Sequence, residues 1–160
     1  MIHDNMRIKK YRIEYGEDRE NILVLESSKN FPNIIGKDLS NPQKIVDCIN
    51  IAFNADRQLE EYAYMVCMDT KCHPVGFFEV SHGSVCETIM SSKSIFQRAL
   101  LSGAASIVIV HTHPSGEPTP SKADREVYEK IKEAGKLIDI ELIDFIIIGD
   151  NCYHSFSEND

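Results

Sequence analysis

The chain alternates between short apolar runs and polar segments, a pattern that predicts several strands with helices between them. Apolar runs of strand length, alternating or continuous, predict strands at residues 6–15, 21–25, 62–68, 75–80, 106–110, 138–148 and 153–156. The first two would form a hairpin around a polar connection. The segment 138–148 is either one long strand or two short strands broken near Asp144. Residues 27–40 show no clear periodicity and are expected to form a loop.

Apolar residues at helical spacing predict three helices. The first begins at Asn41-Pro42, where Asn can cap and Pro suits the first helical position, and extends to about residue 55. The second is capped by Ser91 or Ser92 and ends at Gly103. The third follows Ser121 and carries apolar residues on one face.

The length and composition are typical of one globular domain. The chain has 160 residues, of which 42% are hydrophobic and 26% charged, and it shows no internal repeat or linker. A β-rich pattern with interspersed helices predicts a single α/β domain. No apolar run is long enough to span a bilayer and the N-terminus lacks a signal peptide, so we expect a cytoplasmic protein with no membrane contact.

The distribution of charge excludes one broad class of partner. The formal net charge is −8, and no Lys or Arg follows Lys136 while acidic residues accumulate there. Such a surface repels phosphate backbones, so sequence-independent nucleic-acid binding is not expected. A small basic cluster could contact a phosphate or could be a solvated strand face; it comprises Arg7, Lys9, Lys10 and Arg12.

Candidate chemistry is concentrated in residues 111–124, HTHPSGEPTPSKAD, which connect a predicted strand to a predicted helix. His111 and His113 are two residues apart, so on a continuing strand both imidazoles lie on one face. Asp124 is in the first turn of the next helix. Two imidazoles and one carboxylate are a common catalytic zinc set that leaves the fourth tetrahedral position open.

The same segment also fits a purely structural interpretation. Ser121-x-x-Asp124 matches a capping box, in which Ser accepts from the helix amides and the acid reaches back. That interpretation needs neither histidine and does not exclude a metal, because a capping carboxylate can also be a ligand. The pattern by itself leaves both interpretations open.

The segment resembles the H-x-H-P-x(6)-S-x-x-D signature of the JAMM (JAB/MPN+) metalloproteases. It is closest to the bacterial RadC-like branch, whose usual form is H-N-H-P-S-G-D-P-x-P-S-x-x-D; here Thr112 replaces the Asn and Glu117 the Asp. The likeness extends from about Tyr62 to Phe156. It implies a RadC-like JAB/MPN domain over 41–160, with a mixed, mostly antiparallel sheet flanked by helices, after a strand and loop extension over 1–40.

The resemblance also implies roles for individual residues. His111, His113 and Asp124 would ligate Zn²⁺, and Ser121 would donate to the developing oxyanion, although a plain helix cap explains this serine equally well. The superfamily uses a glutamate as general base. Glu79 is the candidate because it interrupts an apolar strand, with Glu87 as the fallback.

Three functions compete at this stage. The first is a zinc-dependent metallopeptidase that cleaves a peptide or isopeptide bond of a polypeptide substrate. The second is a non-catalytic MPN-type interaction module, against which the retention of all three ligand residues counts. The third is a DNA-repair-associated RadC-like protein, which the acidic charge disfavours. A zinc deaminase would need H-x-E with P-C-x-x-C, and no C-x-x-C occurs.

Overall fold

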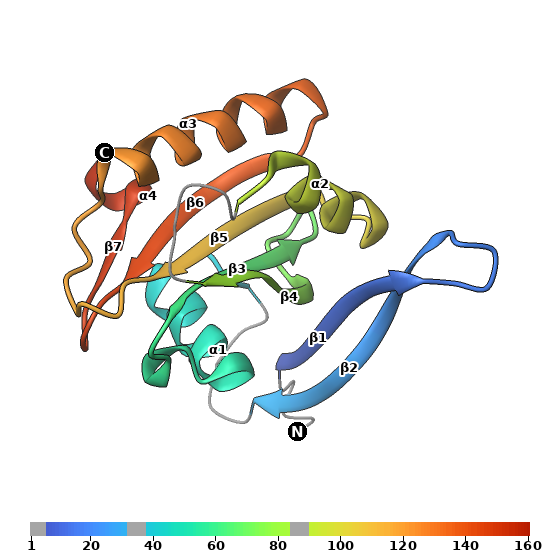
Figure 1. Cartoon of the computed structure of the whole chain (residues 1–160), viewed down its shortest axis with the longest axis horizontal. Helices are drawn as coiled ribbons and strands as arrows, with labels where there is room; N and C mark the ends of the chain where they lie inside the picture. Colours follow the sequence, from blue (N-terminus) through green and yellow to red (C-terminus); the bar gives the residue numbers. More distant parts are fainter. Residues whose placement is uncertain (1–5, 32–37, 84–89) are drawn as a thin grey trace.

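The computed structural model describes residues 6–31, 38–83 and 90–160. It is a mixed α/β fold, and Figure 1 shows its layers. The elements in chain order are β1 (Met6–Tyr15), β2 (Asn21–Phe31), α1 (Pro42–Phe53), the short 3₁₀ helix η1 (Ala55–Arg57), β3 (Glu61–Met68), β4 (Pro74–Gly83), α2 (Ser92–Leu101), β5 (Ser106–Thr112), α3 (Lys122–Leu137), β6 (Glu141–Ile148), β7 (Tyr153–Ser155) and α4 (Phe156–Asn159).

One seven-stranded sheet organises the molecule, with the strand order β2-β1-β4-β3-β5-β6-β7. β1 and β4 pair in parallel, as do β5 and β6, whereas the other four neighbouring pairs are antiparallel. The expectation of a mixed, mostly antiparallel sheet flanked by helices is therefore confirmed. β5 lies inside the sheet between β3 and β6, so the end of β5 is supported on both sides.

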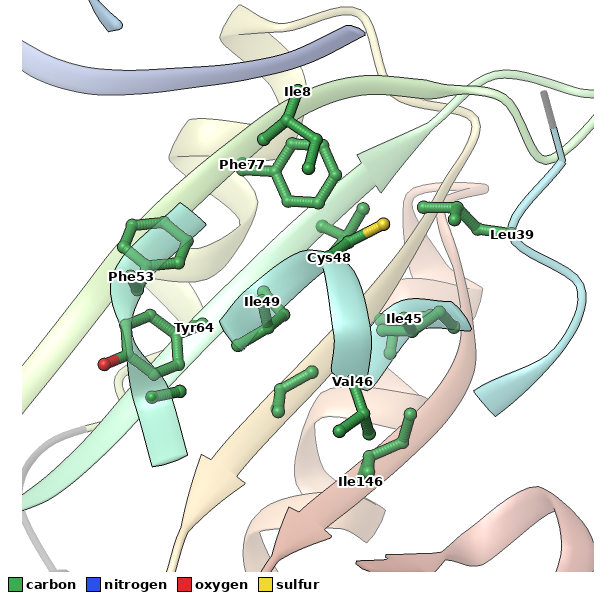
Figure 2. Close-up of a cluster of buried hydrophobic side chains, with 14 of the residues drawn as sticks. Ile8, Leu39, Ile45, Val46, Cys48, Ile49, Phe53, Tyr64, Phe77 and Ile146 are labelled. Carbon is green, nitrogen blue, oxygen red and sulfur yellow. The ribbon is translucent and has the colours of Figure 1, made fainter. Parts of the chain in front are cut away.

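Helix α1 covers one face of the sheet, and α2 and α3 cover the other (Figure 1). Residues of β3 alternate between the two cores: Tyr64 packs on the α1 side and Met65 on the other. Figure 2 shows the α1 side, where Ile45 and Ile49 of the helix point toward the strands. Burying an isoleucine of this kind contributes about 1.5–3 kcal/mol, so α1 is held mainly by its apolar face.

The N-terminal hairpin joins the same sheet and core. β1 pairs with β2 along its length and with β4 at Lys10, opposite Phe77. Met6 and Ile8 are buried in the cluster on the α1 side, where Figure 2 shows Ile8 against Phe77. The extension expected over residues 1–40 is thus attached to the rest through backbone pairing and apolar contact.

Three boundaries differ from the sequence predictions. Residues 27–31, predicted as loop, continue β2, because on an edge strand backbone pairing to β1 suffices without an apolar pattern. The 138–148 segment is one strand that begins only at Glu141 and contains Asp144. Phe156 starts α4 instead of ending β7, because the Ser155 side chain accepts from the Glu158 N–H and caps a helix there.

The helix caps follow the predictions more closely. The Asn41 side chain accepts from the N–H of Gln43 at 2.8 Å, and Ser91 is the residue that caps α2. Among the helices in the described part of the chain, none combines the length and the apolar character that crossing a bilayer requires.

A buried carboxylate ties the C-terminal elements to β6, and we expect its removal to be costly. Asp144 is 2% exposed; it accepts from the Ser155 hydroxyl at 2.6 Å and from the Ser157 N–H at 3.0 Å. Asp144→Ala removes the charged acceptor of the buried Ser155 hydroxyl and of the Ser157 N–H, so the free energy of unfolding should fall by about 3 kcal/mol. Denaturant unfolding measures this.

The control for that measurement is Asp47→Ala, at an exposed position on α1. It should change the free energy of unfolding by no more than about 0.5 kcal/mol. Equal stability of the two variants would show that the Asp144 network contributes nothing to folding.

Candidate metal centre

Strand β5 places the two histidines at the end of the sheet. All seven residues of β5 are buried, and His111 is 3% exposed. Alternation along the strand directs His111 to the same face as Ile107 and Ile109, which is the face that α3 covers. His113 lies just past the strand, where its N–H donates to the carbonyl of Ile148 at 2.9 Å and keeps it beside β6.

Helix α3 places the carboxylate. The predicted capping box is present: the Ser121 hydroxyl accepts from the Asp124 N–H at 3.1 Å, and the Asp124 Oδ2 accepts from the Ser121 N–H at 2.7 Å. The Ser121 hydroxyl also donates to the same Oδ2 at 2.6 Å. Asp124 is 2% exposed, so its carboxylate is fixed inside the protein by the start of the helix.

The three predicted ligand residues converge. His111 Nε2 lies 3.7 Å from Asp124 Oδ1, and His113 Nε2 lies 3.5 Å from Asp124 Oδ2. One ligand atom from each of the three residues lies within 4.8 Å of the other two. The group could therefore hold a metal ion.

Backbone carbonyls orient both imidazoles for this arrangement. His111 Nδ1 lies 3.0 Å from the carbonyl oxygen of Tyr62, and His113 Nδ1 lies 2.8 Å from that of Glu117. A carbonyl oxygen can only accept, so each Nδ1 is the protonated nitrogen. Each Nε2 then faces Asp124. A carbonyl oxygen that accepts from the other ring nitrogen is typical of histidines that ligate metals.

The electrostatics of the group are uneven. Burial lowers the pKa of His111, whereas the hydrogen bond to Asp124 raises the pKa of His113. Burial by itself would raise the pKa of the Asp124 carboxyl, but hydrogen bonds from His113 and Ser121 hold it at about 2. Asp124 is thus ionised at neutral pH, and a proton and a metal ion compete for the space between it and the imidazoles.

The structure does not bring Glu79 to this group. Glu79 is paired with Tyr64 across β3 and β4, and directly opposite residues share a face. Tyr64 packs on the α1 side of the sheet, the face away from His111. The Glu79 carboxylate instead contacts His82 Nδ1 at 3.0 Å. The fallback, Glu87, lies outside the described residues.

Glu61 is the acidic residue that the sequence analysis missed. It is the first residue of β3, two positions before Ala63, which is paired with His111. Continuing this register by two residues brings Glu61 opposite His113 on the face that carries the triad. Its negative charge favours the protonated form of both histidines, although burial still lowers the pKa of His111. The sequence did contain a signal for Glu61. Residues 61 and 63 share a face of the strand that pairs with the histidine strand, so a pairing of Ala63 with His111 places Glu61 on the triad's face.

Comparison with known proteins identifies the family. A family model described as the RadC-like JAB domain matches residues 39–160. The chain therefore belongs to the RadC-like JAB domain family. The match covers α1 to α4 and the whole triad, and leaves β1 and β2 outside it.

Individual relatives agree with this placement. A UPF0758 protein of Clostridium tetani is 37% identical over 140 residues, which cover 87% of this chain and 61% of the relative. A UPF0758 protein of Clostridium beijerinckii is 35% identical over 150 residues, covering 91% and 65%. One of Clostridium perfringens is 40% identical over 101 residues, covering 63% and 44%. The chain thus spans less than two thirds of the length of each of these relatives.

Ser121 should affect both the helix and the metal centre. Ser121→Ala removes the hydroxyl that caps α3 and donates to Asp124, so we expect a loss of about 1 kcal/mol in unfolding free energy. Affinity for added zinc should fall about 10- to 100-fold, because the ligand carboxylate loses an orienting partner. Denaturant unfolding and competition with a zinc-binding dye measure the two effects.

Ser91→Ala is the matched control, because the Ser91 side chain also caps its helix by accepting a backbone N–H, that of Ser94, but lies on α2. It should cost similar stability and leave zinc affinity unchanged. Equal zinc affinity in both variants would mean that Ser121 has no part in positioning Asp124.

Proposed function

We propose that this RadC-like JAB domain is a zinc-dependent hydrolase that cleaves a peptide or isopeptide bond of a polypeptide substrate. The observation that carries the proposal is the convergence of His111, His113 and Asp124 with both Nδ1 atoms held by carbonyls. Two neutral imidazoles and one carboxylate fit zinc, and three protein ligands are the number found in catalytic sites. A bound zinc ion would supply Lewis acidity toward a water molecule and a carbonyl oxygen.

Glu61 is the residue that we propose as general base. It is half-buried at the start of β3, and the β3–β5 register continued by two residues places it opposite His113 on the face of the triad. There it would accept a proton from the attacking water and return it to the leaving nitrogen. Glu79, the earlier candidate, would have to act from the other face of the sheet.

Ser121 fits the proposed mechanism in a positioning role. Its single proton is donated to Asp124, and its oxygen accepts from the Asp124 N–H. To donate to a substrate oxyanion, as the resemblance implies, this hydroxyl would have to turn away from Asp124. The role of orienting Asp124 needs no such change.

The alternative functions lack a comparable observation. A non-catalytic MPN-type module would not need the two imidazoles held in one tautomer. A DNA-directed role finds no support in the acidic C-terminal segment after Lys136. The interaction module remains an outcome of the experiment below.

The test compares two glutamate variants of the zinc-loaded protein on panels of fluorogenic peptides and isopeptides. Wild type should cleave members of a panel, and Glu61→Gln should lower kcat by about 10²- to 10⁴-fold, as removal of a general base does. Zinc content should be unchanged in this variant. Glu79→Gln, the matched control on β4, should retain activity within a few-fold.

The opposite results assign the roles differently. Loss of activity in Glu79→Gln with Glu61→Gln active would make Glu79 the base. Stoichiometric zinc with no cleavage by wild type on any panel would contradict the hydrolase and leave the metal-binding interaction module.

A further inference from the structure

Thr112, the residue between the two histidines, makes a hydrogen bond to the neighbouring strand. It is the last residue of β5 and is 4% exposed. Its Oγ1 accepts from the Tyr62 N–H at 2.9 Å. Tyr62 is the second residue of β3, directly after Glu61. The bond therefore joins the end of β5 to the beginning of β3, beside the metal centre.

Tyr62 is also the residue that orients His111. The Tyr62 carbonyl oxygen lies 3.0 Å from His111 Nδ1. In a β-strand the N–H and the C=O of one residue point to the same side, so Thr112 and His111 both reach Tyr62 from β5. A shift of the Tyr62 main chain after loss of the first bond would move the acceptor of the second.

The hydroxyl acts where the pairing of the two strands ends. The last paired positions of β3 and β5 are Ala63 and His111, and Tyr62 lies one residue beyond them. Backbone at the end of a ladder opens more easily than backbone inside it. On the side of β5, the Thr112 hydroxyl supplies the next link to Tyr62 after the last ladder pair.

The residue type at this position fits the task. The usual form of the RadC-like motif has asparagine where this chain has Thr112. Asparagine and threonine differ in shape, but both are short side chains with an oxygen atom that accepts a hydrogen bond. The replacement thus keeps the property that the Tyr62 N–H requires. Valine has the shape of threonine and lacks this oxygen, so it separates the two properties.

We propose that Thr112 is a positioning residue of the candidate metal centre: its hydroxyl holds the Tyr62 main chain, and Tyr62 holds the His111 imidazole with Nε2 toward Asp124. The proposal rests on the metal centre of the proposed function and assigns the residue between the two histidines. The hydrogen bond at one ring nitrogen decides whether the other is free to ligate. Without the hydroxyl, His111 would also adopt the tautomer that carries its proton on Nε2.

NMR of the metal-free protein tests this directly. Long-range ¹⁵N–¹H correlation spectra, at a pH at which the imidazoles are neutral, show which ring nitrogen carries the proton. The His111 signals are identified by their absence in His111→Gln. Wild type should show His111 protonated on Nδ1, and Thr112→Val should show a second form protonated on Nε2. Zinc affinity, measured by competition with a zinc-binding dye, should fall about tenfold in Thr112→Val.

Two further variants separate positioning from stability. Thr112→Ser keeps the hydroxyl and should match wild type in both measurements. Ser155→Ala is the matched control, because it removes another buried hydroxyl, on β7, that donates to Asp144. It should lower stability and leave both measurements unchanged. Should Thr112→Val not fold, Thr112→Ala removes the same acceptor with a smaller side chain and should give the same two results.

The outcomes also distinguish this proposal from the hydrolase. His111 protonated only on Nδ1 in Thr112→Val, with wild-type zinc affinity, would overturn the proposal, as would a Thr112→Ser variant that behaves like Thr112→Val. Equal changes in Ser155→Ala would overturn it too, because lost stability would then explain them. Neither measurement uses a substrate. Tautomer and zinc affinity that depend on Thr112, in a wild type that cleaves nothing, would support the positioning role and contradict the hydrolase.

Discussion

The burial of the Asp124 carboxylate is the constraint on which the arrangement of the His111, His113 and Asp124 triad depends. An ionised carboxylate that is 2% exposed needs partners, and Asp124 finds them in the N–H and hydroxyl of Ser121 and in two imidazoles. One side chain thus closes the first turn of α3 and joins that helix to the end of β5. The capping box and the candidate metal centre therefore share one carboxylate, and the two interpretations of the motif are compatible.

The neighbours of β5 in the sheet hold the two histidines of the candidate metal centre. β3 contributes the Tyr62 carbonyl that orients His111, and β6 contributes the Ile148 carbonyl that holds His113 in place. The same pairing brings the start of β3, with Glu61, to the histidines.

The sequence predicted the features that depend on residues close together in the chain. The caps at Asn41 and Ser121 follow from neighbouring residues. The triad was a candidate from the two-residue spacing and the helix start, and the family resemblance favoured it over a plain helix cap. The face on which Glu79 lies depends on register with β3 and on the shift between Ala63 and Tyr64, which one sequence does not specify. Glu61 was missed for the same reason, since its neighbour His113 is distant in sequence. The strand over 27–31 depends on pairing alone.

The most direct test of the account is a crystal structure of the zinc-loaded protein with data collected on both sides of the zinc absorption edge. The account predicts one anomalous peak that lies between the Nε2 atoms of His111 and His113 and a carboxylate oxygen of Asp124, at about 2.0–2.2 Å from each ligand atom. Glu61 should be the nearest acid that is not a ligand. A peak elsewhere, or none at full zinc loading with the triad intact, would contradict the metal centre and every role derived from it.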